Sequence, residues 1–487
     1  MPIRSDTAAD RRIAIALFVV TLGCYAYTFG GGGWNENASF ALVRAVVEQR
    51  TISIERYLST TGDVSRSGGR TYSNKPPGVA FLAIPVYAAL VAGERAAGLE
   101  FDQFKVTTAN AYVCTVAVCG VLGALIPVAL FLHGRAQGIA DARWLVLVSL
   151  TVALGTPLFG YATALWVHVP SAALLFLAYV LLHRSPAAAG FLAAMAVATN
   201  YVSAIPMAIF AILLFLPRER RAARLFRFCA GAVLPAVLVG WYHTAAFGAF
   251  YRTPIDSLTP EFVTRGAMLG IFVRPSLDAL WGVTFSPYRG LFYSAPVLLV
   301  ALAGAITLFR AGKRRELVTL AAIVLFFLLV NASFNGWFGG YSFSARYLLP
   351  IVPFLGVAML YASSVPRTLF VLLALVSVTV QTVVAAVDVH APTEIRRPLV
   401  VYVLPQLLHG ELQVSGTHDY GRTRVGHVAV NPLSATTCNC PSAWSSFNLG
   451  EPLFGQGSVL SLLPLLLWMA GGSAVVFRLA WQAEERG

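Results

Sequence analysis

Long runs of apolar residues, separated by shorter polar segments, constrain this chain more than any other feature. A helix needs about 20 apolar residues to cross the hydrocarbon core of a bilayer. Of the 487 residues only 12% are charged, whereas a soluble domain carries about twice that share. These features predict an all-α polytopic membrane protein with about 12 transmembrane helices, and they exclude a soluble globular domain, a disordered chain and a nucleic-acid-binding domain. The runs lie near 12–30, 77–97, 107–132, 144–163, 168–183, 189–216, 228–247, 291–309, 317–333, 347–363, 368–388 and 457–478.

One run is less regular than the others. Within 189–216 the apolar residues are interrupted by Asn200, Tyr201 and Pro206. Such interruptions are tolerated inside a membrane where protein or water satisfies the freed backbone groups. The sequence leaves two alternatives open here, one broken helix or two short ones.

Arginine and lysine residues indicate the orientation of the chain. Cytoplasmic loops are enriched in these residues, and they gather at both termini and in the segments 217–227 and 310–315. An even number of runs separates each of these four segments from the next, which predicts that both termini are cytoplasmic. The loop with Arg135 and Arg143 then lies outside as an exception. No convincing cleavage site follows the first run, so we expect a retained span and not a signal peptide.

This orientation places every long loop on the outer face. Long polar loops commonly carry function, so we expect the functional site at the extracytoplasmic face of a bacterial inner (plasma) membrane. The long outer loops are 31–76, 248–290, 334–346 and 389–456.

The first outer loop combines a helical pattern with two acidic candidates. Within 37–50 the apolar residues recur at i, i+3, i+6 and i+7 from Phe40, which is typical of a helix lying in the membrane interface. Such a helix would hold Glu36 and Asp63 near the headgroups, where a carboxylate can act as general base for an incoming hydroxyl. The structural alternative is that Glu36 caps the helix and Asp63 belongs to a Gly-Asp turn.

A lysine stands at the outer end of the second run. Lys75 precedes Pro76-Pro77, and proline is well tolerated in the first turn of a helix. A cation at this boundary could bind a lipid phosphate, or it could be an ordinary snorkelling lysine. The neighbouring Arg70 and Tyr72 favour the functional interpretation.

Two later segments each place an arginine beside aromatic residues where a run begins. Arg289 follows Tyr288, and Arg346 lies between Trp337 and Tyr347. Arginine offers a planar fork of donors that fits phosphate oxygens. Aromatic residues at this depth are more often part of the interfacial belt than sugar-binding platforms.

The histidines are less informative. An ionisable residue within a span is a functional candidate by default, and this applies to His168 and His243. Neither has an acidic neighbour in sequence, so we expect both to be buried, hydrogen-bonded residues. The last outer loop holds further histidines and an acid whose spacing is not diagnostic of a metal site, namely His390, His409, His418, His427 and Asp419.

Six cysteines are present, and four of them lie in or beside the runs, where we expect them to pack. Cys438 and Cys440 lie in the last outer loop. A disulfide between them is plausible in an oxidising compartment, and the sequence does not decide whether it forms.

Taken together, these residues resemble a family of integral-membrane glycosyltransferases, the GT-C superfamily. Its members use sugars carried on polyprenyl phosphate, and they include the protein O-mannosyltransferases and the aminoarabinose transferase of lipid A. The resemblance rests on the retained first span, on acids early in the loop that follows, and on three motifs. These are Tyr72-Ser73-Asn74-Lys75-Pro76-Pro77, Tyr288-Arg289-Gly290-Leu291-Phe292, and Trp337-Phe338-Gly339-Gly340 leading to Arg346-Tyr347.

The resemblance covers about residues 12–365. It implies a catalytic module over 1–365 with the outer loops 31–76, 248–290 and 334–346, followed by C-terminal spans over 366–487 with the outer loop 389–456. One departure from the family is that Asn35-Glu36 stands where relatives often carry two acids. Another is that Asn74 stands where an acid often precedes Lys-Pro.

The mechanism that the resemblance implies is an inverting displacement at the anomeric carbon of a polyprenyl-phosphate-linked sugar. The acceptor would be a hydroxyl of a lipid, glycan or protein, and nucleic acid is not expected as a partner. No metal ligand is assigned, although a divalent metal is possible as a cofactor. The implied roles are Asp63, then Glu36, as base, with Lys75, Arg346 and Arg289 on the donor phosphate and Tyr72, Arg70, Tyr288, Trp337 and Tyr347 on the substrate.

A transporter or flippase of a lipid-linked or small polar substrate is the main alternative. Transporters often place ionisable residues and broken helices at mid-membrane depth in repeated halves. Here the charges concentrate in loops and the halves do not repeat. Only the interruption in 189–216 and His168 favour transport, and a non-catalytic scaffold is a third possibility.

Overall fold

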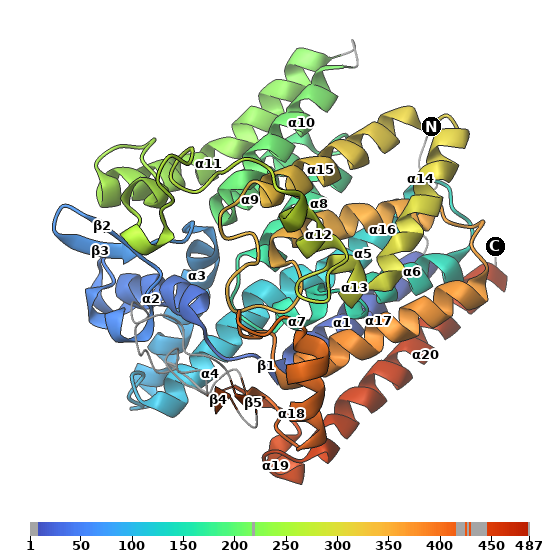
Figure 1. Ribbon diagram of the computed structural model, residues 1–487. Helices are drawn as coiled ribbons and strands as arrows, with labels where there is room; N and C mark the ends of the chain where they lie inside the picture. The colour runs from blue at the N-terminus through green and yellow to red at the C-terminus, as the bar shows by residue number, and fades with distance from the viewer. Residues whose placement is uncertain (1–7, 217–219, 415–423, 426–427, 430–445, 486–487) are drawn as a thin grey trace.

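The computed structural model describes residues 8–216, 220–414, 424–425, 428–429 and 446–485 (Figure 1). Most of the described residues are helical, and the strands form three short two-stranded pairs. Cys438, Cys440, His418, His427 and Asp419 lie outside the described residues.

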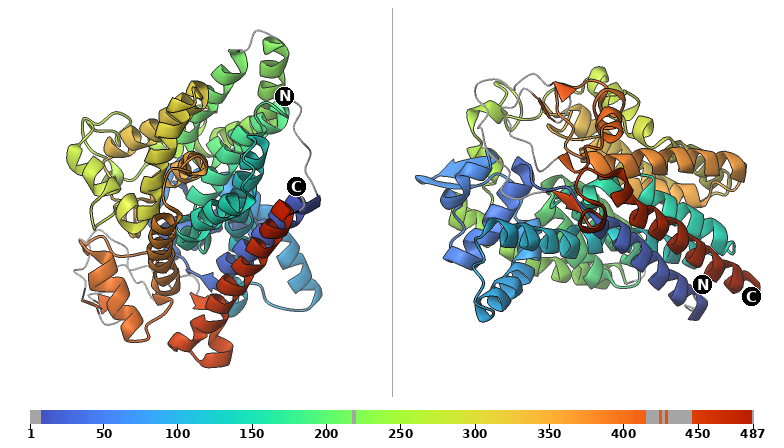
Figure 2. Two further views of the ribbon diagram at one scale, coloured as in Figure 1. Left: turned by 90° about the vertical axis from the view of Figure 1, so that its right-hand side faces the viewer. Right: turned by 90° about the horizontal axis from the view of Figure 1, so that it is seen from below.

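The helices form a bundle in which long segments from both ends of the chain lie together (Figure 2). Among the described helices, six are long and apolar enough to cross a membrane, and seven further apolar helices are shorter. The predicted all-α polytopic membrane fold is therefore confirmed. The longer helices are α1 (Ala8–Tyr27), α2 (Trp34–Gln49), α3 (Gly78–Ala96), α4 (Phe104–Thr115), α5 (Val121–Ala136), α6 (Ala142–Leu154), α8 (His168–Leu181), α9 (Pro186–Thr199), α10 (Ala204–Phe215), α11 (Arg221–Phe247), α14 (Val300–Arg310), α15 (Arg314–Ala332), α16 (Val352–Leu360), α17 (Arg367–Val387) and α20 (Leu463–Glu485).

Short elements fill the connections. A π-helical turn, Val116–Gly120, joins α4 to α5. The short helices are α7 (Leu158–Ala162), α12 (Leu277–Thr284), α13 (Leu291–Ser294), α18 (Leu404–Leu408) and α19 (Glu451–Phe454). The paired strands are β1 (Thr28–Phe29) with β6 (Phe447–Asn448), β2 (Val64–Ser67) with β3 (Arg70–Ser73), and β4 (Arg424–Val425) with β5 (Val428–Ala429).

The interrupted run 189–216 forms two short helices. Asn200 is extended, a 3₁₀ turn covers Tyr201–Ser203, and α10 starts anew at Ala204. The two helices lead in opposite directions, because Leu213 near the end of α10 and His183 just before α9 both contact Arg315. Of the two alternatives left open by the sequence, the structure has the second.

Ion pairs gather the charged helix ends on the face where α1 begins and α20 ends, called here the terminal face. Asp10 of α1 pairs with Arg135 of α5 at 3.1 Å. Arg143 of α6 pairs with Glu484 of α20 at 2.6 Å. The loop with Arg135 and Arg143 therefore lies on the same face as the described ends of the chain, and its predicted place on the opposite face is wrong.

The physical reason lies in α3, which does not traverse the bundle. Tyr112 of α4 donates a hydrogen bond to the carbonyl of Ala26, so α4 begins on the face opposite the terminal face, and α3 ends close to that point. Gly78 at the start of α3 packs against the end of α9 on that same face. The run 77–97 is apolar and long enough to span a membrane, but it begins and ends on one side. Counting it as a span assigns each later loop to the wrong face, until the division of 189–216 into α9 and α10 adds a crossing and brings the count back into agreement.

Close packing fixes the start of α3 beside the segment that carries Lys75. A Cβ built on Gly78 would lie 2.4 Å from the carbonyl carbon of Ala198, which is far inside van der Waals contact, so only glycine fits. Glu48 of α2 accepts hydrogen bonds from Tyr57 at 2.9 Å and Tyr87 at 2.6 Å. Through these contacts the loop 31–76 is held against α3.

The topology can be tested by cysteine labelling in a cysteine-free background. Gln137→Cys and Ala311→Cys are expected to react with an impermeant maleimide from the same side of sealed vesicles, because His133 and Glu316 beside these loops lie 3.5 Å apart. Glu100→Cys, in the turn between α3 and α4, is expected to react from the other side. Labelling of Gln137→Cys and Ala311→Cys from opposite sides would contradict this topology and support the one predicted from the arginine and lysine residues.

Candidate functional site

A β-hairpin brings Asp63 next to Lys75. Gly68 and Gly69, both with positive φ, form the tip between β2 and β3. The register pairs Val64 with Ser73, so the residues that flank this pair become neighbours. Asp63 Oδ2 lies 2.8 Å from Lys75 Nζ, and Asp63 Oδ1 accepts a long hydrogen bond of 3.4 Å from Asn74.

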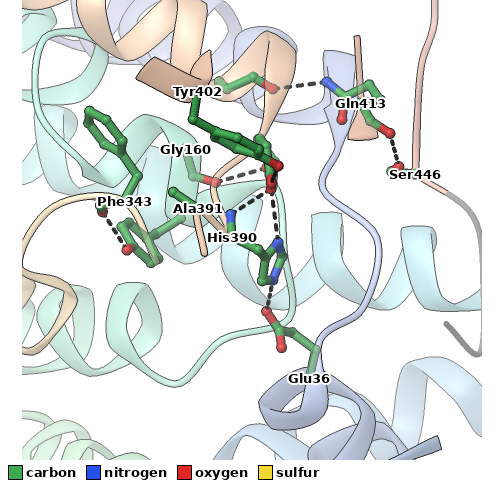
Figure 3. A network of polar contacts seen from close by, with 12 residues as sticks. Glu36, Gly160, Phe343, His390, Ala391, Tyr402, Gln413 and Ser446 are labelled. Carbon is green, nitrogen blue, oxygen red and sulfur yellow. Dashed lines mark hydrogen bonds and ion pairs between the residues drawn. The ribbon is translucent and has the colours of Figure 1, made fainter. Parts of the chain in front are cut away.

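Glu36 lies in the first turn of α2 and is 1% exposed. Its Oε1 is 2.5 Å from Nε2 of His390, which follows α17 in the sequence (Figure 3). Its Oε2 is buried and has no hydrogen-bond partner among the described residues. One oxygen of this carboxylate is therefore fixed and the other is unused.

His390 is itself held by Asp388, and its environment favours the protonated ring. The backbone N–H of His390 donates to Asp388 Oδ1 at 2.6 Å, and Tyr402 donates to Asp388 Oδ2 at 2.5 Å. Burial alone would lower the pKa of His390, but the two carboxylates, Glu36 and Asp388, outweigh it and raise the pKa to about 9. At neutral pH the Glu36–His390 contact is thus an ion pair.

Arg346 lies close to this pair across an aromatic side chain. Its guanidinium carbon is 5.1 Å from the ring centre of Trp166, and the Trp166 ring is 4.7 Å from that of His390. Arg346 Nη2 donates to the hydroxyl of Tyr347 at 3.4 Å, while its buried Nε has no partner within the described part of the chain. A cation with a free donor thus lies near a carboxylate with a free acceptor.

Lys75 and Arg346 share a neighbour. Both act electrostatically on the imidazole of His168 at the start of α8, and the His168 ring lies 5.3 Å from that of Tyr347. Arg346 thus adjoins Tyr347, Trp166 and, through Trp166, the Glu36–His390 pair, whereas Lys75 is held against Asp63 on the hairpin.

Arg289 has a different role in this arrangement. It is 1% exposed, and burial lowers its pKa to about 10, which still leaves it charged at neutral pH. All three guanidinium nitrogens donate to backbone carbonyls, those of Tyr288, Phe338, Gly340, Ala391 and Pro392. Arg289 thus joins three loops, and none of its nitrogens is left without an acceptor.

The predicted substrate-binding residues are dispersed. Tyr72 is buried against Phe247, with ring centres 5.5 Å apart, and Arg70 is exposed at the hairpin tip, about 16 Å along the extended strand from Lys75. Tyr288 donates to the carbonyl of Thr393 at 2.6 Å, and Trp337 packs edge-on against it. Among the predicted substrate contacts, Tyr347 is the one that touches Arg346.

Three residues of the site were missed or misread from the sequence. Trp166 lies in a segment of ordinary apolar character, and Asp388 follows a span without a motif. His390 was considered only as a metal ligand. The signal that could have indicated its role is the short acid-x-His spacing of Asp388 and His390 directly after an apolar run.

The two histidines near spans differ from each other. His243 bonds to Tyr201 at 2.7 Å and to the carbonyl of Phe250 at 3.1 Å, which confirms the prediction of a buried, hydrogen-bonded residue. For His168 that prediction is wrong, because neither ring nitrogen has a partner among the described residues. No group of three or more His, Cys, Asp or Glu side chains in the described ranges could hold a metal ion.

Comparison with known proteins gave matches in solved structures alone. No family model and no curated protein matches the chain. The crystal structure of ArnT from Cupriavidus metallidurans in the apo state is similar over 98% of this chain and 76% of its own, with 14% identity and a TM-score of 0.48. The cryo-EM structure of the arabinofuranosyltransferase AftD from Mycobacteria is similar over 78% of this chain and 27% of its own, with 20% identity and a TM-score of 0.41.

At 14% and 20% identity, the resemblance to the GT-C superfamily stays a prediction from the motifs. The chain spans less than a third of AftD. With TM-scores below 0.5, neither likeness supports an argument about the site residues or substrates of this chain.

The ion pair predicts a specific pH dependence of stability. The pKa of His390 is raised from 6.5 to about 9 on folding, so its stabilisation is fully present below pH 6.5 and is lost as pH rises through 9. A shift of this size corresponds to about 3 kcal/mol. The melting temperature of the wild type in detergent should therefore fall more steeply between pH 7.5 and 10.5 than that of His390→Gln.

The matched control is His409→Gln, which changes an exposed histidine outside the site. It is expected to keep the wild-type slope. Equal slopes for the wild type and His390→Gln would show that the imidazole is not charged in the folded protein.

Proposed function

We propose that this chain is a membrane glycosyltransferase that moves a sugar from a polyprenyl-phosphate carrier to the hydroxyl of a lipid, glycan or protein acceptor. The motifs of the sequence support this reading. So does the placement of a carboxylate, Glu36, near the guanidinium of Arg346, to which it is linked through His390 and Trp166. The observation that carries the proposal is that Glu36 Oε2 and Arg346 Nε are both buried without a partner among the described residues.

Buried polar atoms in proteins are almost always hydrogen-bonded, and leaving one unpaired costs about 1–3 kcal/mol. An acceptor on a carboxylate suits an incoming hydroxyl, and a donor on a guanidinium suits a phosphate oxygen. Strain and unpaired groups of this kind are expected where a substrate completes the hydrogen bonding.

The proposed reaction is a single inverting displacement. Glu36 accepts the proton of the acceptor hydroxyl as its oxygen forms a bond to the anomeric carbon. The bond between that carbon and the phosphate oxygen breaks, and polyprenyl phosphate leaves with the electron pair. Lys75 and Arg346 stabilise the charge that develops on the leaving phosphate, so no general acid is required.

The geometry favours Glu36 over Asp63 as the base, which reverses the order suggested by the sequence. Both oxygens of Asp63 have partners, Lys75 and Asn74, whereas Glu36 keeps one oxygen free. Asp63 then orients the ammonium group of Lys75, and Arg289 holds the loops around the site. Tyr347 orients Arg346 through its hydroxyl.

The site belongs to the face opposite the terminal face, where α2, the hairpin and the end of α17 meet. Arginine and lysine residues concentrate at the terminal face, which supports a cytoplasmic assignment for it. We infer that transfer takes place on the extracytoplasmic side of a bacterial inner membrane.

Loss of the base should lower the rate of transfer even at temperatures where the variant remains folded. In membranes supplied with radiolabelled polyprenyl-phosphate sugars, Glu36→Gln is expected to lower the transfer rate by about 10²-fold or more. Asp63→Asn should retain more activity, because it changes the position of Lys75 and not the base. The matched control is Glu100→Gln, an exposed carboxylate in the turn after α3.

Wild-type rates in folded Glu36→Gln, with loss in Asp63→Asn, would return the role of base to Asp63. If no carrier-linked sugar is consumed by the wild type, the enzyme proposal itself fails and the transporter alternative gains weight.

Substitutions of Arg346 should show whether binding of the donor phosphate needs only the positive charge or also the geometry of the guanidinium donors. Arg346→Lys keeps the charge but loses the fork of donors, so we expect about a tenfold loss in kcat/KM for the carrier-linked sugar, and a larger loss in Arg346→Gln. Arg66→Gln, exposed on β2, serves as the control. Equal activity in Arg346→Gln and the wild type would remove Arg346 from the donor site.

A further inference from the structure

His168 is a buried imidazole whose hydrogen-bonding capacity the protein does not use. It is the first residue of α8 and is 2% exposed. Neither Nδ1 nor Nε2 has a hydrogen-bond partner among the described residues. In contrast, His243, which is also buried, is bonded through both nitrogens. The two buried histidines therefore differ, because hydrogen bonds hold the ring of His243 and none from the described residues holds that of His168.

Three aromatic side chains surround the ring of His168. Its ring centre lies 5.3 Å from that of Tyr347, 6.3 Å from that of Trp166 and 6.4 Å from that of Tyr161. Small-molecule sites are commonly lined by apolar and aromatic side chains with a few polar groups that fix orientation. A single imidazole among flat rings matches this description, and flat rings suit the faces of a sugar.

The charged groups nearby have a different chemistry. Lys75 and Arg346 act on His168 from their own positions, and cations of this kind suit a phosphate. A neutral imidazole offers one donor and one acceptor. A sugar hydroxyl likewise has one donor and can accept, so it can pair with either nitrogen of the neutral imidazole. A phosphate dianion can only accept.

We propose that His168 contacts the transferred sugar and exchanges a hydrogen bond with one of its hydroxyl groups. This inference rests on the proposed function, since it assigns the carrier phosphate to Lys75 and Arg346 and the sugar to His168. A site built to bond a hydroxyl rejects an analogue that lacks it, so His168 selects among sugars and does not contribute to binding of the bare carrier.

The test compares the bare carrier with three sugar-linked carriers on the same purified protein. Thermal stabilisation in detergent is measured with polyprenyl phosphate and with polyprenyl-phosphate-linked glucose, mannose and arabinose. The wild type should be stabilised by polyprenyl phosphate, and further by at least one linked sugar. His168→Phe keeps the aromatic volume but removes both polar atoms. It should keep the effect of polyprenyl phosphate and lose the additional effect of the sugar, with affinity for the linked sugar lowered by about tenfold.

Two further variants make the result specific. His168→Asn retains a donor and an acceptor and should recover part of the effect of the sugar. His243→Phe removes a histidine whose nitrogens are both hydrogen-bonded, so it should lower the melting temperature without ligand. It should leave the additional stabilisation by the linked sugar over polyprenyl phosphate unchanged. Without ligand, His168→Phe should melt at or above the wild-type temperature, because no hydrogen bond is lost.

The inference is overturned if His168→Phe keeps the full additional effect of the sugar, if it loses the effect of polyprenyl phosphate as well, or if it is destabilised without ligand. The sugar contact is also overturned if polyprenyl phosphate stabilises the wild type and no sugar-linked carrier stabilises it further. Failure of the wild type to respond to any of the four lipids is a distinct outcome. It contradicts the proposed function, and with it the role of His168.

Discussion

The ion pair between Glu36 and His390 is the interaction on which the arrangement of the site depends. The two residues are separated by 354 positions in the sequence, and the pair joins the loop after the first helix to the segment after α17. Breaking a buried ion pair by removing one partner typically costs about 3–5 kcal/mol, because the other charge remains buried. The pair therefore orients the carboxylate and ties the loop after α1 to the segment after α17.

The other charged groups of the site are held by the same principle, each in its own way. Lys75 is positioned by a carboxylate that a hairpin places beside it, and Arg289 by carbonyl oxygens from three loops. The transmembrane helices provide the frame, and these charged groups lie where their connections meet. Functional residues on loops require such fixed partners, because a loop without them would not hold its side chains in one geometry.

The sequence was sufficient to predict the helical membrane fold, because apolar runs of the required length leave little choice in a bilayer. It was not sufficient to predict the path of α3, whose composition allows a span and whose packing against α2 and α9 keeps it on one face. Counting basic residues in loops could not reveal this, since a second departure, the division of 189–216, compensated for it.

The site was predictable in part for a related reason. Lys75 and Arg346 stand out because charge beside a span needs an explanation, and the structure places Arg346 near the Glu36–His390 pair and Lys75 on Asp63. The roles of Arg289, Trp166 and His390 depend on contacts between segments far apart in the chain, which one sequence does not show. Asp63 and Glu36 looked alike as candidates, and what separates them is which oxygen has a partner.

Glu36 and its partner His390 come from distant parts of the chain, since 354 positions separate them. A ribosome must therefore produce more than three quarters of the polypeptide before Glu36 can pair with His390. The same late segment supplies Ala391 and Pro392, two of the five carbonyls that accept hydrogen bonds from Arg289. A nascent chain that ends before this segment thus holds Glu36 without its counterion and Arg289 with an incomplete set of acceptors.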